Sequence, residues 1–164
     1  MNSGDVVDLV ASLSELGVVF WLDGGWGVDC LLQEETRKHG DVDLVISRSD
    51  MASVEELLSS RGFEVIRDLS PTAVAYGHAD GREVDLHPVD VTDDGGGDQI
   101  LEDGSVWHYS APTWGTVAGE PVLCASATDQ ILMHEGYPTR PVDIADVRAL
   151  CARFNMDLPE RFSG

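Results

Sequence analysis

Basic residues are scarce in this chain. Only 10 of its 164 residues are lysine or arginine, against 30 aspartates and glutamates, and the formal net charge is −20. This charge repels polyanions, so we expect no nucleic-acid partner. It attracts divalent metal ions and cationic ligands. A solvated acidic surface with no bound ligand explains the charge equally well, so composition alone does not identify a ligand.

Cysteines are few and long apolar runs are absent. The three cysteines, Cys30, Cys124 and Cys151, are odd in number and lie far apart, without the spacing of a zinc site. No apolar run approaches the length of a transmembrane helix, and the first residues lack the basic and apolar regions of a signal peptide. We therefore expect a cytoplasmic protein with reduced thiols and no membrane partner.

The hydrophobic periodicity predicts an α+β fold, in which a small mixed β-sheet is backed by helices and followed by a helical C-terminal portion. Helical spacing alternates with short apolar runs typical of strands, and Asp80-Gly81 is typical of a hairpin turn. The expected helices cover residues 6–16, 26–32, 51–58, 126–136 and 144–154. The expected strands cover residues 18–22, 42–46, 63–66, 72–78, 83–87, 107–109 and 121–123.

The chain is short enough for one compact unit with two parts. Residues 1–110 are expected to form the core, including a mobile acidic loop over residues 90–104, where Asp, Gly and Glu predominate. Residues 111–164 are expected to form a mainly helical portion that shapes a substrate site. Too little chain follows the acidic loop for a second core.

Two carboxylates precede and enter the second predicted strand. Asp41 and Asp43 are two residues apart, and strand side chains alternate between faces, so both project from the same face. Converging carboxylates repel each other unless a cation lies between them. Oxygen ligands that leave room for water and phosphate suit Mg²⁺ or Mn²⁺. On its own, an Asp-x-Asp pair is more often a solvated strand edge.

A third carboxylate follows on a later strand. Asp85 and His87 share one face of the segment that follows the hairpin turn, while Val84 and Leu86 share the other. If this strand lies beside the Asp-x-Asp strand, three carboxylates are available to hold two metal ions about 3.5–4 Å apart, as in-line phosphoryl displacement requires. Asp85 is then a candidate base for an attacking hydroxyl. His87 assists it, replaces it, or is purely structural.

A glycine pair precedes these carboxylates. Gly24 and Gly25 lie between an apolar run and a predicted helix, where backbone N–H groups are able to bind phosphate. Arg37 and Lys38 are rare cations in the following loop, and we interpret one of them as a triphosphate contact. A solvated loop that balances local acid is the alternative. The chain has no P-loop, no complete dinucleotide fingerprint and no nucleophile elbow.

Three aromatic residues follow the acidic segment. Trp107, Tyr109 and Trp114 have the chemistry to cradle a cationic sugar or amine. Packing beneath a long loop explains them equally well.

In this order, the motifs resemble the nucleotidyltransferase superfamily of DNA polymerase beta, and more closely its small antibiotic nucleotidyltransferases. Segments that resemble the lincosamide enzymes are residues 21–29, Asp85-Leu86-His87-Pro88, Asp93-Asp94-Gly95 and His134-Glu135-Gly136-Tyr137. Segments that resemble the aminoglycoside enzymes are Arg37-Lys38-His39-x-Asp41-x-Asp43 and Pro121-Val122-x-Cys124. The similarity covers nearly the whole chain.

The resemblance implies Mg²⁺-dependent transfer of a nucleoside monophosphate, usually AMP from ATP, to a hydroxyl group of an antibiotic. It implies that Asp41, Asp43 and Asp85 bind the metal and that Gly24 and Gly25 bind phosphate. The expected acceptor is a small cationic hydroxylated antibiotic, and the oligomeric state stays open, a homodimer included. The alternatives are a nucleotidyltransferase of the toxin–antitoxin type that modifies a protein, and a non-catalytic module that binds a nucleotide or drug.

Overall fold

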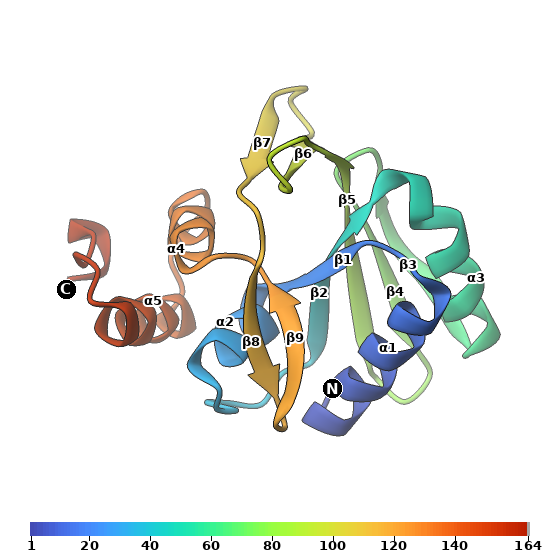
Figure 1. Cartoon of the computed structure of the whole chain (residues 1–164), viewed down its shortest axis with the longest axis horizontal. Helices are drawn as coiled ribbons and strands as arrows, with labels where there is room; N and C mark the ends of the chain where they lie inside the picture. The colour runs from blue at the N-terminus through green and yellow to red at the C-terminus, as the bar shows by residue number, and fades with distance from the viewer. Residues whose placement is uncertain (164) are drawn as a thin grey trace.

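A mixed sheet carries the core in the computed structural model, which describes residues 1–163 (Figure 1). The main strand order is β3-β4-β5-β2-β1-β9-β8, and β6 joins β5 and β7 beyond this path. The strands are β1 (Phe20–Asp23), β2 (Asp41–Ser47), β3 (Phe63–Leu69), β4 (Ala73–His78), β5 (Glu83–Val91), β6 (Gly97–Ile100), β7 (Val106–Tyr109), β8 (Thr113–Val117) and β9 (Glu120–Cys124). The α-helices are α1 (Ser3–Leu16), α2 (Gly24–Leu32), α3 (Met51–Ser60), α4 (Ala127–Glu135) and α5 (Pro141–Phe154), and the 3₁₀ helices are η1 (Arg48–Asp50) and η2 (Glu160–Phe162). The predicted α+β class is confirmed.

The first helix begins and ends where its sequence predicts. The Asn2 side chain accepts from the backbone of Asp5, whose own side chain accepts from the Asn2 backbone, and these two bonds form a capping box. Gly17 ends the helix in the left-handed conformation, with φ of 69°. The inner face of α1 is buried through Val6 and Leu9, among others, so this helix covers the sheet.

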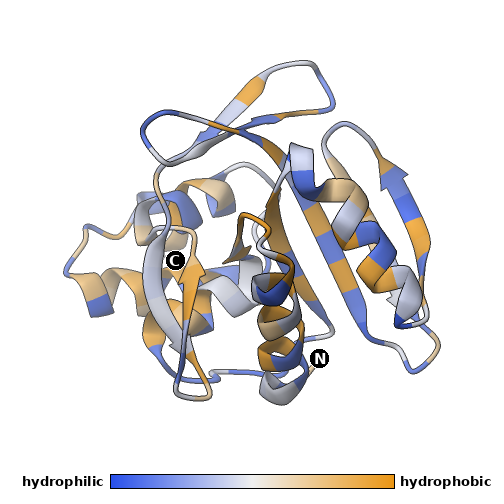
Figure 2. Ribbon diagram, turned by 45° about the vertical axis from the view of Figure 1, so that its right-hand side comes forward, coloured by the Kyte–Doolittle hydropathy of each residue, from blue (hydrophilic) through white to orange (hydrophobic). Residues whose placement is uncertain are grey.

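The two faces of the central strands differ in chemistry. Val42 and Leu44 of β2 and Val84 and Leu86 of β5 are fully buried in the core beneath α1, α2 and α3. Figure 2 shows hydrophobic and hydrophilic residues alternating along the strands at its right-hand side. Alternation places the aspartates on the opposite face, which continues into a small second core around Trp21. One face of the sheet therefore stabilises the fold, and the other is polar.

The register aligns the two polar strands. β2 pairs with β5 in parallel, with Asp43 opposite Asp85 and Asp41 opposite Glu83. β1 pairs with β2 in antiparallel orientation, and this brings Asp23 opposite Asp43. Three aspartates from three strands thus lie in one row across the sheet.

The predicted mobile loop over residues 90–104 is wrong. β5 extends to Val91, and the chain then forms β6, which pairs with β5 and β7 (Figure 1). Asp90, Gly97 and Asp98 lie in these strands, and the remaining Asp and Gly residues of the segment lie in tight turns. In the first of these turns Asp94 accepts hydrogen bonds from the Thr92 hydroxyl and the Gly96 backbone N–H. Between the turns Gln99 is buried, and backbone pairing fixes the segment as a hairpin.

Residues 111–164 begin with two strands, the second of which contains the predicted strand over residues 121–123. β8 and β9 form a hairpin, and β9 joins β1 in parallel through Leu22 and Cys124. α4 and α5 follow and lie on one side of the sheet, away from α1 and α3 (Figure 1). Over residues 1–163, no helix has both the length and the apolar character that crossing a bilayer requires. The C-terminal part therefore completes the sheet before it adds its helices.

Candidate active site

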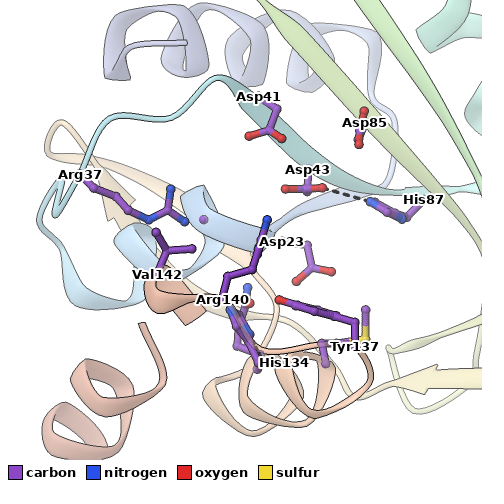
Figure 3. A pocket seen from close by; sticks show the side chains of 14 residues that line it. Asp23, Arg37, Asp41, Asp43, Asp85, His87, His134, Tyr137, Arg140 and Val142 are labelled. Atoms are coloured by element: carbon purple, nitrogen blue, oxygen red, sulfur yellow. Dashed lines mark hydrogen bonds and ion pairs between the residues drawn. The ribbon is translucent and has the colours of Figure 1, made fainter. Parts of the chain in front are cut away.

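A cavity of about 480 Å³ opens over the polar face of the central strands (Figure 3). β1, β2 and β5 form one wall, the start of α2 and the loop after it form another, and α4, α5 and the turn between them form the third. The lining residues are Asp23, Gly24, Gly25, Arg37, Asp41, Asp43, Asp85, His87, Gln130, Met133, His134, Tyr137, Arg140 and Val142.

All three predicted metal-binding carboxylates line this cavity. Asp43 and Asp85 face each other in the strand register, and Asp41 lies one alternation earlier on β2. Arg67 Nη2 donates to Asp85 Oδ2 over 2.9 Å, whereas Asp85 Oδ1 is buried without a hydrogen-bond partner. Burial, and then the charge of Asp43, raises the pKa of Asp85. A cation beside these carboxylates would relieve both costs.

The carboxylates form an open set of oxygen donors. Within residues 1–163, no three His, Cys, Asp or Glu side chains are close enough to form a complete metal cluster. The unpaired oxygen of Asp85 and the all-oxygen chemistry of the set nevertheless fit Mg²⁺, which retains water and binds substrate phosphate oxygens. Metal binding by Asp41, Asp43 and Asp85 stays a prediction.

His87 is hydrogen-bonded to Asp43. Its Nε2 lies 3.3 Å from Asp43 Oδ1, and its Nδ1 lies 3.3 Å from Gln99 Nε2. Burial lowers the pKa of His87, but the hydrogen bond to Asp43 and the charges of Asp43, Asp23 and Asp85 outweigh it, so the net shift is upward. The contact allows His87 to orient the Asp43 carboxylate at the cavity.

The glycine pair begins α2 at the edge of the cavity. Gly24 has φ of 55°, and a Cβ there would lie 2.1 Å from Asp43 Oδ2. A Cβ at Gly25 would lie 2.5 Å from His39 Nδ1 and 2.6 Å from Arg37 Nη2. Any side chain at Gly25 therefore first displaces these two residues, before it blocks a phosphate. Phosphate binding by the pair stays a prediction.

The loop after α2 presents one cation to the cavity. Arg37 lines it, donating from Nη2 to Asp146 Oδ2 over 3.0 Å, with its Nη1 3.0 Å from His39 Nδ1. Lys38 is exposed and is not among the lining residues in the described part of the chain. Arg37 therefore lines the cavity and Lys38 does not, and triphosphate binding by either residue stays a prediction.

Asp23 is a lining residue whose role the sequence did not indicate. It is 4% exposed, and the Tyr109 hydroxyl donates to its Oδ2 over 2.9 Å. Burial raises the pKa of Asp23, which the His87 charge opposes and the Asp43 charge reinforces. The sequence feature that could have identified Asp23 as a site residue is its position directly before the glycine pair, at the end of a buried strand.

The third wall supplies a second cation. Arg140 Nη2 donates to Asp143 Oδ1 over 2.8 Å, and its guanidinium lies 5.5 Å from the centre of the Tyr137 ring. Burial works against ionisation of Asp143, but its hydrogen bonds with Arg140 prevail and lower its pKa. Tyr137 and His134 belong to a segment that the resemblance had indicated, whereas no motif pointed to Arg140.

The proposed aromatic cradle does not form at this cavity. Tyr109 is fully buried and reaches the site only through its hydroxyl group. Trp107 packs edge-to-face against Tyr109, with ring centres 6.3 Å apart. Trp114 on β8 is 67% exposed. Among the described residues, none of the three aromatics lines the cavity.

Comparison with known sequences identifies relatives over most of the chain. A family model described as aminoglycoside-2''-adenylyltransferase matches residues 5–150. A lincosamide resistance protein from Staphylococcus haemolyticus is 28% identical over 135 residues, which cover 81% of this chain and 84% of that protein. A 2''-aminoglycoside nucleotidyltransferase from Escherichia coli is 28% identical over 120 residues, which cover 72% of this chain and 64% of that protein.

Solved structures agree in fold. A crystal structure of the lincosamide antibiotic adenylyltransferase LnuA with lincomycin bound has a TM-score of 0.82 at 25% identity, covering 92% of this chain and 96% of that one. A crystal structure of ANT(2'')-Ia in complex with adenylyl-2''-tobramycin has a TM-score of 0.74 at 22% identity, covering 93% of this chain and 88% of that one. The predicted antibiotic-nucleotidyltransferase resemblance is thereby confirmed, and the chain belongs to the aminoglycoside-2''-adenylyltransferase family.

Proposed function

We propose that this protein transfers AMP from ATP to a hydroxyl group of a cationic antibiotic, a lincosamide or an aminoglycoside, with Mg²⁺ as its cofactor. The observation that carries the proposal is the pairing of Asp43 with Asp85 across two central parallel strands, where one buried Asp85 oxygen has no partner. A protein that only bound a drug would gain nothing from holding these like charges together. Family membership supports the nucleotidyl-transfer chemistry.

The nucleotide is assigned to the α2 side of the cavity. The glycine pair exposes backbone at the first turn of α2, where N–H groups point outward and attract phosphate. Arg37 faces the same space and offers a planar set of donors to the anionic triphosphate. Asp41, Asp43 and Asp85 would hold Mg²⁺, which would neutralise triphosphate charge and lower the pKa of the acceptor hydroxyl.

The transfer step needs a proton acceptor, and this chain supplies one. The acceptor hydroxyl oxygen bonds to the α-phosphorus of ATP as the bond to the pyrophosphate oxygen breaks, and pyrophosphate departs. Asp85 takes the hydroxyl proton, because its carboxylate arrives from a different strand than Asp41 and Asp43 and borders the cavity.

The acceptor is assigned to the side of the cavity that α4 and α5 enclose. A cation is favoured in the cavity by the protein's net charge of −20 and by Asp23 on the sheet wall, while Arg140 on the helical wall is paired with Asp143. The matched relatives that carry lincosamide and aminoglycoside names support both antibiotic classes.

The test is transfer itself. The protein is incubated with Mg²⁺, each of the four nucleoside triphosphates in turn, and a panel of lincosamides and aminoglycosides, and mass spectrometry records any nucleotide adduct. An Asp43→Asn variant, matched in size and lacking the central charge, is the control and should give none. A nucleotide adduct on a protein instead of on a drug would favour the alternative in which the enzyme modifies a protein. Binding of triphosphate without turnover would favour the non-catalytic module.

A further inference from the structure

We propose that His39 and Asp29 are positioning residues, which hold the Arg37 guanidinium in the orientation that binds the triphosphate. This inference rests on the proposed function, because the triphosphate is the ligand assigned to Arg37. Neither His39 nor Asp29 lines the cavity in the described chain, so both would act through Arg37.

The pair is rigidly buried. The side chains of His39 and Asp29 are 1% and 2% exposed, and His39 Nε2 lies 2.5 Å from Asp29 Oδ2. The second oxygen of Asp29 accepts from the Thr36 hydroxyl over 2.6 Å. The Trp26 ring lies against the imidazole, with ring centres 4.6 Å apart. These contacts fix both the position and the tilt of the imidazole ring.

The hydrogen-bond partners of His39 determine which of its ring nitrogens carries the proton. Arginine only donates hydrogen bonds, so His39 Nδ1, which lies 3.0 Å from Arg37 Nη1, must be the acceptor. The proton of the ring then lies on Nε2 and is donated to the Asp29 carboxylate. Asp29 thus selects the tautomer that presents a lone pair to Arg37. In the opposite tautomer, the N–H group of His39 Nδ1 would face the N–H donor of Arg37, and no hydrogen bond would form.

Arg37 is fixed at both terminal nitrogens. Nη1 meets His39, while Nη2 donates to Asp146 on α5, and the absence of a side chain at Gly25 leaves room for both contacts. Arg37 Nε is buried without a hydrogen-bond partner, and the guanidinium borders the cavity (Figure 3). Hydrogen-bond donors therefore remain for an anion after the anchoring bonds are made.

Two substitutions of His39 separate the two hydrogen bonds. His39→Asn keeps an oxygen near the position of Nδ1 and can still accept from Arg37, whereas His39→Gln keeps an amide nitrogen near Nε2 and loses that acceptor. The measurement is the Kd of a non-hydrolysable ATP analogue by titration calorimetry, with thermal unfolding to check folding. We expect His39→Gln to raise Kd roughly tenfold, as loss of a charge-assisted hydrogen bond does, and His39→Asn to raise it less.

A double-mutant cycle tests whether His39 acts through Arg37. In the Arg37→Ala background, His39→Gln should leave the Kd unchanged. A further tenfold loss there, or equal affinities of wild type and His39→Gln, would overturn the positioning role. If wild-type protein bound no triphosphate, the proposed function would fail instead.

A measurement on the wild-type protein needs neither folding of a variant nor nucleotide. The ¹⁵N chemical shifts of the His39 ring report which nitrogen carries the proton. We expect the proton on Nε2 and none on Nδ1. A proton on Nδ1 would overturn the inference even if the enzyme proved active.

Discussion

Replacing Asp85 by Asn should make the metal-free protein more stable while abolishing transfer. One oxygen of Asp85 is buried without a partner, and the carboxylate faces the charge of Asp43 across the register. Asn is nearly the same size and carries no charge, so the substitution removes the repulsion and the larger part of the desolvation cost. Within residues 1–163, the substitution removes one ion pair, with Arg67, whose side chain is 55% exposed.

The balance of these terms gives the size of the effect. Leaving a buried polar group unsatisfied costs about 1–3 kcal/mol, and more when the group is charged, whereas an exposed ion pair contributes about 0.2–1 kcal/mol. The neutral amide still leaves one polar atom unpaired, so we expect a net gain of about 1 kcal/mol. For a chain of this length, that gain raises the midpoint of thermal unfolding by about 2–4 °C.

The pH dependence has a definite sign. Burial, and then the charge of Asp43, raises the pKa of Asp85 in the folded protein above its unfolded value. The folded wild type therefore binds the proton more readily, and its handicap relative to Asp85→Asn is fully present above the folded pKa. The difference in stability should shrink as the pH falls through that value.

The assay is thermal unfolding followed by circular dichroism, first with EDTA and then with Mg²⁺. Mg²⁺ should raise the midpoint of the wild type and leave Asp85→Asn nearly unchanged. Asp90→Asn is the matched control, because Asp90 lies on the same strand and pairs with Arg48, but is 60% exposed. If Asp85→Asn unfolded below the wild type in EDTA at neutral pH, the pair with Arg67 would outweigh the repulsion and the reasoning would be refuted.

Three further predictions concern neighbouring residues. Gly24→Ala should destabilise the fold by about 1 kcal/mol or more in thermal unfolding, because alanine is strained at this φ and its Cβ meets Asp43; unchanged stability would contradict this. Arg37→Ala should raise the KM for the triphosphate more than Lys38→Ala does, and equal effects would return Lys38 to the site. His87→Ala should lower kcat less than Asp85→Asn does. If His87→Ala lowered kcat more, His87 would be the base.

Local patterns were sufficient to predict the central strands and their chemistry. Asp43 and Asp85 each alternate with buried apolar residues, and this fixes the face on which each carboxylate lies. That the two strands are neighbours was a condition of the sequence argument, and their parallel orientation was not predicted. Arg37 lines the cavity and Lys38 does not, a difference that the sequence did not indicate, because side-chain direction in a loop depends on tertiary contacts.

Other features depend on contacts that no local pattern encodes. The segment from Gly97 to Ile100 is a strand because it pairs with β5 and β7, although its composition is typical of a loop. Arg140 reaches the cavity because the turn between α4 and α5 brings it to the same space as Asp43 of β2, which lies 97 residues earlier in the sequence. Tyr109 meets Asp23 across a separation of 86 residues.

The pairing of β2 with β5 makes catalysis sensitive to single-residue insertions and deletions. Strand faces alternate with every residue, so removing one residue between the Asp80-Gly81 turn and Asp85 would turn this carboxylate into the core and put Leu86 in its place at the cavity. Chains misaligned in this way would be inactive even if they were compact. Length changes in the turns at residues 92–96 and 101–105 leave this alignment intact, so tolerated variation in chain length should concentrate there.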